Sequence, residues 1–124
     1  MIHLDTGYLI RSLIPGTAQD RQLRQWIESG ESLGISAIAW TEFLCGPVSA
    51  GDIALADRLL SEQTPFNEAD AEIAARLFNE SGRRRGTLAD CMVAAISIRI
   101  GAPLATTNQS DFERLEGSGL RLFR

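Results

Sequence analysis

The sequence predicts an α/β domain with a central, mainly parallel sheet flanked by helices. Short apolar runs typical of strands alternate along the chain with longer segments in which apolar residues recur at helical spacing. The chain has 124 residues, a length that fits one domain of ordinary size. Its composition, 44% apolar and 23% charged, is typical of a chain that folds around its own core. We therefore expect residues 1–124 to form a single domain.

Elements in the first half of the chain are predicted from apolar runs and from the residues that start or stop helices. A glycine paired with Pro or Ser follows each of the first three predicted helices and is a typical stop signal. Ser36 is placed to cap the third of these helices. In order, we predict a strand at 1–4, helices at 9–14 and 19–28, a strand at 33–35, a helix that starts after Ser36 and ends at Gly46-Pro47, and a helix at 51–60.

The second half of the chain continues the alternation. Asn67 can cap a helix, and Thr87 and Asp90 have the spacing of a capping box, with Asp in place of the usual Glu. The helix that follows Asp90 is almost continuously apolar, which predicts that it is buried. In order, we predict a weak strand at 64–66, a helix at 68–80, the buried helix at 91–100, a strand at 102–106, a short helix at 111–115 and a last strand at 120–123.

The charged residues exclude several classes of function. All 12 basic residues are Arg, and Lys is absent. A P-loop, whose Lys reaches nucleotide phosphates, and Schiff-base chemistry are therefore excluded. The formal net charge of −4 argues against a general nucleic-acid binder, because affinity for phosphates comes mainly from basic side chains. Any contact with nucleic acid must come from local patches.

Neither a membrane span nor a secretory signal is expected. The longest nearly uncharged run, 91–98, is far shorter than the ~20 residues of a membrane-spanning helix, and the N-terminus lacks the pattern of a secretory signal. We expect a cytoplasmic location. Cys45 and Cys91 lie far apart, without the spacing of a zinc site or a redox motif, and we expect both to be reduced and buried.

Four carboxylates are predicted to gather at one edge of the sheet. Asp5 directly follows the first strand, and Glu42 lies about two turns into the helix after the second strand. Asp90 starts the buried helix, and Asp111 follows the strand at 102–106. In parallel α/β sheets, ligands bind beyond the carboxyl ends of the strands. Each Asp could instead be a simple helix cap, and Glu42, which we expect to be partly buried among apolar neighbours, could instead face solvent.

Converging carboxylates predict a cation between them. Three or four such groups would repel one another strongly without one. Hard oxygen ligands favour Mg²⁺ or Mn²⁺, and magnesium usually binds a few carboxylates together with water and substrate phosphate. The pattern therefore indicates metal-assisted phosphodiester hydrolysis. A phosphatase of the haloacid dehalogenase type is excluded, since it needs a second Asp where Gly7 stands and also a Lys.

Four segments of the chain resemble, in order, the motifs of the PIN-domain ribonucleases, and within them the VapC-like toxins of bacterial toxin-antitoxin modules. The segments are Ile2–Thr6, Ile38–Phe43, Leu88–Ala95 and Leu104–Phe112. The resemblance implies a PIN-like three-layer fold that cleaves single-stranded RNA with one or two Mg²⁺ or Mn²⁺ ions. It also implies a cognate antitoxin that blocks the site, and a homodimer.

The resemblance assigns roles to individual residues. Asp5 and Asp90 match the firmest metal ligands, Glu42 a ligand that acts directly or through water, and Asp111 the most variable acid. The supporting polar positions, which hold the metal's water or lie beside the fourth acid, are matched by Thr6, Thr106 and Asn108. Gly7 departs from the pattern, since relatives often carry a small hydroxyl residue there.

Two alternatives remain open at this point. Arg83, Arg84 and Arg85 stand just upstream of Asp90, where they could bind RNA phosphates, receive an acidic segment of the antitoxin, or only face solvent. The chain could also be a PIN-like fold retained as an RNA- or protein-binding module with too weak a site to turn over RNA. The only histidine, His3, falls inside the first strand, and we expect it to be structural.

Overall fold

Four short strands form a central parallel sheet in the order β3-β2-β1-β4. The computed structural model describes residues 1–124. The chain places β2 and β3 on one side of β1 and then crosses to place β4 on the other side, so the strand order reverses beside β1. The strands are β1 (Ile2–Leu4), β2 (Leu33–Ser36), β3 (Glu62–Thr64) and β4 (Leu104–Ala105).

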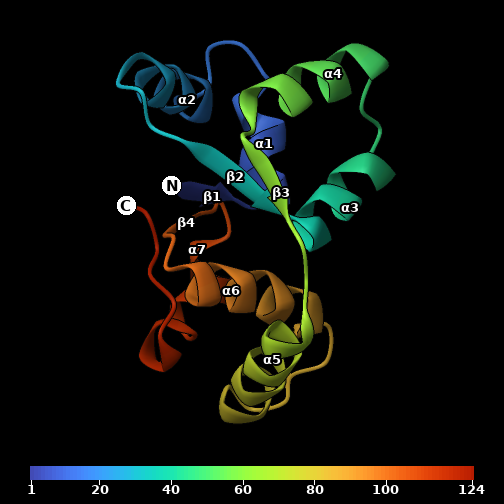
Figure 1. Ribbon diagram of the computed structural model, residues 1–124, viewed down its shortest axis with the longest axis vertical. Coiled ribbons are helices and arrows are strands. Elements are labelled where there is room, and N and C mark those ends of the chain that lie inside the picture. The colour runs from blue at the N-terminus through green and yellow to red at the C-terminus, as the bar shows by residue number, and fades with distance from the viewer.

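Helices cover both faces of the sheet, which confirms the predicted three-layer α/β architecture. Figure 1 shows α1, α2 and α4 above the sheet and α5 and α6 below it, with α3 at the end of the strands. None of the helices has the length and apolar character that crossing a membrane requires. The helices are α1 (Thr6–Ser12), α2 (Ala18–Glu28), α3 (Ala37–Cys45), α4 (Ala50–Leu59), α5 (Glu68–Glu80), α6 (Leu88–Ile100) and α7 (Gln109–Glu113), followed by a 3-10 turn at Glu116–Ser118.

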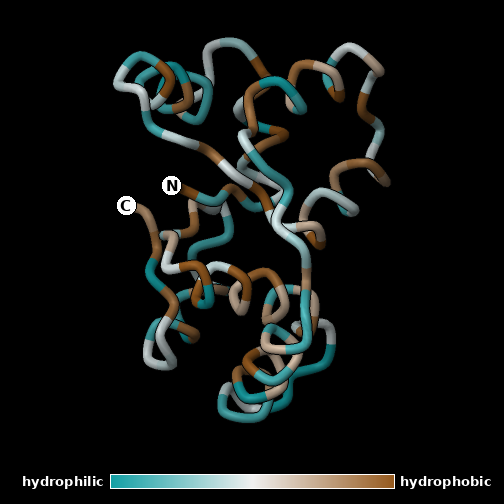
Figure 2. The backbone as a smooth tube through the Cα atoms, viewed as in Figure 1, coloured by the Kyte–Doolittle hydropathy of each residue, from teal (hydrophilic) through white to brown (hydrophobic).

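One core of 23 buried apolar residues holds the layers together. The strands β1 and β2 are buried along their whole length, and α6 buries Cys91 and the unbroken run 93–97. The helices α2 and α5 are amphipathic, and Figure 2 shows hydrophobic and hydrophilic residues alternating along them. The predicted burial of α6 is therefore confirmed. This helix packs against α5, α3, α7 and β2, and its first turn carries Asp90.

His3 is buried at the centre of the sheet, as expected for a structural residue. Its side chain is only 1% exposed, and its Nε2 lies 3.3 Å from the hydroxyl of Thr64 on β3. Gly34 on β2 is paired with His3, and a methyl group at Gly34 would lie 2.9 Å from the Nε2 of His3 and from the Met1 sulfur. A glycine is needed at this point because the imidazole occupies the space beside it.

The burial of His3 predicts that stability falls with acidity. Burial lowers the pKa of His3 from 6.5 to about 4, so between these values the unfolded chain binds a proton that the folded protein rejects. We expect the free energy of unfolding to fall by up to about 3 kcal/mol as the pH drops through this window. Urea unfolding at pH 7 and at about pH 4.5 measures the loss, and His3→Gln should lack it. An equal pH dependence in both proteins would contradict this assignment.

Several details differ from the sequence predictions. The first helix begins at Thr6 instead of residue 9, and the short helix predicted at 111–115 spans Gln109–Glu113. Thr87 precedes α6 but makes no capping hydrogen bond through its side chain, because its hydroxyl donates to the carbonyl of Arg84 instead. The predicted strand at 120–123 is reduced to a single bridge between Leu104 and Leu122, and the weak strand expected at 64–66 is β3, displaced toward the N-terminus. Cys91 is buried, but Cys45 is exposed because it ends α3 on the solvent side.

Candidate active site

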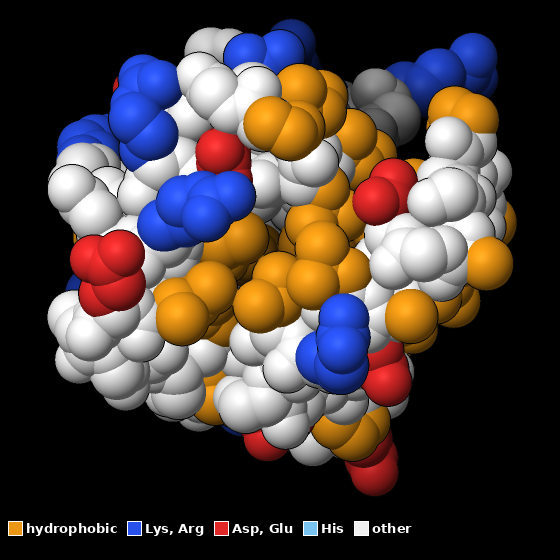
Figure 3. All heavy atoms as spheres, turned by 90° about the horizontal axis from the view of Figure 1, so that it is seen from above, with side chains coloured by type: hydrophobic (Ala, Val, Ile, Leu, Met, Phe, Trp, Pro, Cys, Tyr) orange, Lys and Arg blue, Asp and Glu red, His pale blue; other side chains and the backbone are white.

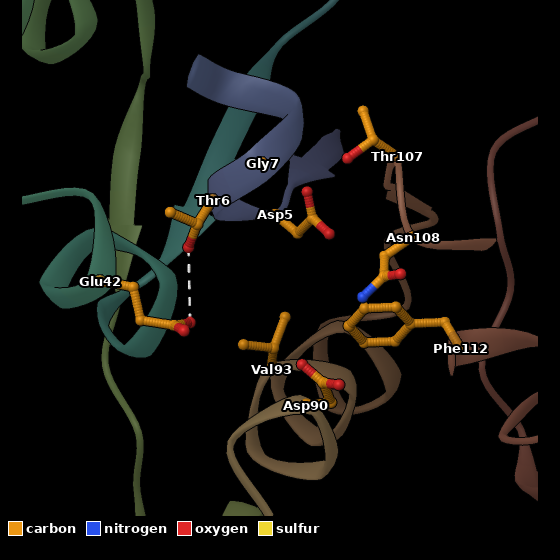
Figure 4. A pocket seen from close by; sticks show the side chains of 9 residues that line it. All are labelled: Asp5, Thr6, Gly7, Glu42, Asp90, Val93, Thr107, Asn108 and Phe112. Carbon is orange, nitrogen blue, oxygen red and sulfur yellow. Dashed lines mark hydrogen bonds between the residues drawn. The ribbon is translucent and has the colours of Figure 1, made fainter. Parts of the chain in front are cut away.

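Three of the four predicted carboxylates line one cavity of about 230 Å³. Its lining includes residues that directly follow β1 and others just after β4, so the cavity lies beyond the carboxyl ends of these strands, where the strand order reverses. Asp5 reaches it from the end of β1, Glu42 from α3, and Asp90 from the first turn of α6 (Figure 4). The full lining comprises Asp5, Thr6, Gly7, Glu42, Asp90, Val93, Thr107, Asn108 and Phe112.

Asp5 is held in place by hydrogen bonds to both of its carboxylate oxygens. Its Oδ1 accepts from the backbone N–H of Tyr8 at 2.8 Å, so Asp5 is also the N-cap of α1. Its Oδ2 accepts from the hydroxyl of Thr106, which follows β4. The side chain is buried, with 8% exposure, and it faces the cavity. Asp5 can therefore cap α1 and also take part in a functional site, because each carboxylate oxygen can accept more than one hydrogen bond.

Glu42 is exposed, so the expectation that it would be partly buried is wrong. It lies on α3 beside Phe43, which points into the core while Glu42 points into the open cavity. Thr6, the first residue of α1, donates its hydroxyl to the carbonyl of Ala39 at 3.0 Å and lies 3.4 Å from Glu42 Oε1. These contacts link the start of α1 to α3 across one side of the cavity.

Asp111 lies outside the cavity lining but close enough to influence Asp90. Its Oδ2 accepts from the side-chain amide of Asn108 at 2.7 Å, and Asn108 itself lines the cavity. The backbone N–H of Asn108 donates to the hydroxyl of Thr106 at 2.9 Å. Thr106 thus connects two parts of the site, since it accepts from Asn108 and donates to Asp5. The hydroxyls of Thr6 and Thr106 are both engaged with protein groups.

The acidic groups disfavour one another's charge. Burial raises the pKa of Asp5, and the negative charge of Asp90 adds to this rise, while the hydrogen bonds from Thr106 and Tyr8 oppose it. Burial also raises the pKa of Asp90, and the charges of Asp111 and Glu42 raise it further. Among the cations, Arg114 alone offsets this effect at Asp90. The site therefore carries an excess of negative charge that a bound cation would relieve.

The donor set fits a hydrated divalent cation. Every titratable side chain that lines the cavity is a carboxylate, and the other polar groups there are hydroxyls and an amide. No three side chains of His, Cys, Asp or Glu lie close enough together to enclose an ion directly. Magnesium keeps several of its waters in proteins and needs only one or two direct carboxylates. Oxygen donors spread around a cavity of this size suit such an ion.

Comparison with known proteins agrees with this geometry. The profile of the PIN-domain family matches residues 2–118. The chain belongs to the PIN-domain family. PIN domains are generally nucleases. No curated protein sequence matches the chain.

Several solved structures share the fold of this PIN domain over nearly the whole length of both chains. VapBC2 from Rickettsia felis bound to a DNA fragment from its promoter is 19% identical, covers 99% of this chain and 98% of its own, and has a TM-score of 0.76. DNA-bound VapBC from Salmonella typhimurium is 20% identical, with coverages of 99% and 98% and a TM-score of 0.75. FitAcB from Neisseria gonorrhoeae is 22% identical, with coverages of 100% and 97% and a TM-score of 0.72.

The structure adds residues to the site of this PIN domain that were not assigned a role from the sequence. Thr107 lines the cavity, and a methyl group at Gly7 would lie 2.9 Å from its hydroxyl, so the glycine leaves room for it. Val93 and Phe112 form the apolar part of the lining. Thr107 and Phe112 lie within the motif segment Leu104–Phe112, so the sequence could have indicated that they belong to the site. Arg114 carries no such signal, because its place beside Asp90 depends on how α7 packs against α6.

The three consecutive arginines lie in the exposed loop between α5 and α6, ahead of Asp90. Arg83 is tied to α5, since its guanidinium donates to the side chain of Asn79 and lies 5.5 Å from the centre of the Phe78 ring. Arg84 and Arg85 are exposed, and their side chains make neither a hydrogen bond nor an ion pair. The three residues are therefore not equivalent.

Proposed function

We propose that this PIN domain is a Mg²⁺- or Mn²⁺-dependent endoribonuclease that cleaves single-stranded RNA, and that it acts as the VapC-like toxin of a toxin-antitoxin pair. The observation that carries the proposal is the convergence of Asp5, Glu42 and Asp90 on one cavity where the strand order reverses. An RNA substrate is consistent with the cytoplasmic location predicted from the sequence. The homodimer also remains a prediction.

Asp5, Asp90 and Glu42 would hold the ion, with Asp111 at the edge of the site. When bound, the ion would lower the pKa of its water, orient the scissile phosphate and offset the phosphate's charge. The protein's own part is to fix the acids. Thr106 holds Asp5 in one orientation, and Asn108 holds Asp111. No histidine takes part, because His3 is enclosed within the sheet.

The antitoxin is proposed to bind an apolar groove on the opposite face of the sheet from α5 and α6. A second cavity, of about 310 Å³, lies between α1, α2 and α4, and Figure 3 shows it as a hollow of hydrophobic side chains with charged groups around it. Ile27 and Leu55 line it and are exposed. The occupant that fits is the apolar face of an antitoxin segment, since exposed apolar hollows with polar rims are typical of protein interfaces. Similar folds occur in the VapBC complexes.

One cleavage assay tests both parts of the proposal. Purified protein is incubated with total cellular RNA and Mn²⁺, with EDTA in place of the metal, or with Mn²⁺ after addition of its antitoxin. We expect discrete fragments only in the first sample, because the acids cannot activate water without the ion. Fragments that persist in EDTA would contradict the metal-dependent site. RNA that stays intact in Mn²⁺ would favour the binding-module alternative, and fragments that persist with antitoxin would contradict the toxin role.

A further inference from the structure

Most arginines of this chain are engaged with other protein groups. Eight of the 12 donate to a carboxylate, an amide or a backbone carbonyl. An engaged guanidinium is held in one orientation by its partner, so it is less free to bind a ligand than an unengaged one. The side chains that make no hydrogen bond or ion pair belong to Arg58, Arg84, Arg85 and Arg114.

Three of these four arginines flank the start of α6. Arg84 and Arg85 lie in the loop that leads into this helix, whose first turn carries Asp90 (Figure 1). Arg114 ends α7, which packs against α6, and its charge acts on both Asp90 and Cys91. The Nε of Arg114 is buried without a partner. The fourth arginine, Arg58, lies near the end of α4 on the other face of the sheet.

The backbone of the loop separates Arg83 from its two neighbours. Arg83 is the only residue other than glycine with a positive φ, at 55°, and its N–H donates to the carbonyl of Phe78 at 2.9 Å. Its side chain folds back on Asn79 and Phe78. The carbonyl of Arg84 accepts from the N–H and hydroxyl of Thr87. The loop is therefore closed by Arg83 and Thr87, which leaves the side chains of Arg84 and Arg85 exposed.

We propose that Arg84, Arg85 and Arg114 form a phosphate-binding rim around the start of α6, where they bind backbone phosphates of a single-stranded RNA that enters the acidic cavity. The proposal rests on the proposed function for the choice of RNA. Guanidinium groups bind phosphate oxygens in a bidentate manner, and these three need not break an ion pair to do so. An acidic peptide is the less suitable occupant, because the groove proposed for the antitoxin lies across the sheet from this rim.

The rim is tested by the salt dependence of RNA binding. A short fluorescein-labelled single-stranded RNA is titrated with protein in EDTA, which prevents cleavage, and fluorescence anisotropy is measured at several salt concentrations. Each phosphate contact on a single strand contributes about 0.7 to the slope of log K against log salt. We expect Arg84→Gln, Arg85→Gln and Arg114→Gln each to reduce the slope by about that amount. Gln keeps most of the stem length and removes the charge.

Two matched variants separate the rim from a general charge effect. Arg58→Gln removes an unpaired charge remote from the cavity and should leave the slope unchanged. Arg83→Gln should lower the melting temperature and leave the slope near the wild-type value, because the side chain of Arg83 holds the loop against α5. An equal fall of the slope in Arg58→Gln would overturn the proposal. A slope that stays at the wild-type value in both Arg84→Gln and Arg85→Gln would also overturn it, even if these variants bind the antitoxin less tightly. The two exposed residues keep the test valid if Arg114→Gln fails to fold.

The test also separates the rim from the nuclease function. If the salt slope falls in the rim variants but the wild-type protein cuts no RNA in Mn²⁺, the proposed function is refuted and the rim is upheld. If the wild-type protein cuts RNA but the salt slope is the same in the rim variants, the function is upheld and the rim is overturned.

Discussion

Replacing Asp90 with Asn is expected to reduce RNA cleavage by roughly 100-fold or more while the fold is retained, since removal of one group that stabilises the reacting charges costs about this much. Asp90 faces the cavity from the first turn of α6, and its side chain makes no hydrogen bond within the protein. Asn has the same shape, and it removes a charge that Asp111 and Glu42 disfavour. The melting temperature without metal should therefore be equal to that of the wild type or higher.

A remote acid controls for the loss of one negative charge. Glu72 is exposed on α5, away from the cavity, and Glu72→Gln should cleave at the wild-type rate. Rates are compared on the same RNA with Mn²⁺ in excess, and circular dichroism confirms that each variant is folded. An Asp90→Asn variant that cleaves as fast as Glu72→Gln would remove Asp90 from the site.

Replacing Asp70 with Ala is expected to cost about 3 kcal/mol of unfolding free energy. Asp70 is 0% exposed, and it accepts from Arg99 Nε at 2.6 Å and from a second guanidinium nitrogen at 3.0 Å. It also accepts from the backbone N–H of Asn67 at 2.9 Å in the capping box of α5. The substitution leaves Arg99 with only the carbonyl of Pro65 as a partner and removes one half of the cap, so this contact between α5 and α6 is lost.

An exposed ion pair on the same helix is the control for Asp70. Glu80 pairs with Arg76 on the solvent side of α5 at 3.5 Å, and exposed pairs contribute about 0–1 kcal/mol. Urea unfolding of Asp70→Ala and Glu80→Ala measures the difference. Equal losses in the two variants would show that burial of the Asp70–Arg99 pair does not govern its contribution.

The convergence of three of the four acids could be predicted because it follows from chain topology, whereas Asp111 lies outside the cavity lining. Strands that alternate with helices form parallel sheets, and the carboxyl ends of parallel strands meet at one edge. Asp5 and Asp90 needed no further information to be placed there. Glu42 was also predicted to lie at this edge of the sheet, and it does. Its exposure, however, depends on which side of α3 faces the core. Phe43 takes the core side, and an apolar neighbourhood in sequence cannot show that Glu42 faces the cavity.

The differences among the arginines could not be read from the sequence. Arg83, Arg84 and Arg85 are identical neighbours, and only the positive φ of Arg83 and its contacts with α5 set it apart. The charge of Arg114 acts on Asp90 because α7 packs on α6, which no local pattern encodes. The strand predicted at 120–123 failed for a similar reason, because it pairs with β4 at Leu122 alone.

Titration of the protein with Mn²⁺ by calorimetry tests the metal site most directly, with Asp90→Asn and Glu72→Gln measured beside the wild type. The arrangement of Asp5, Glu42 and Asp90 around one cavity predicts saturable binding in the wild type and in Glu72→Gln. Binding should be lost or strongly weakened in Asp90→Asn. Absence of Mn²⁺ binding in the folded wild-type protein, or equal binding in all three proteins, would contradict a metal site at this cavity.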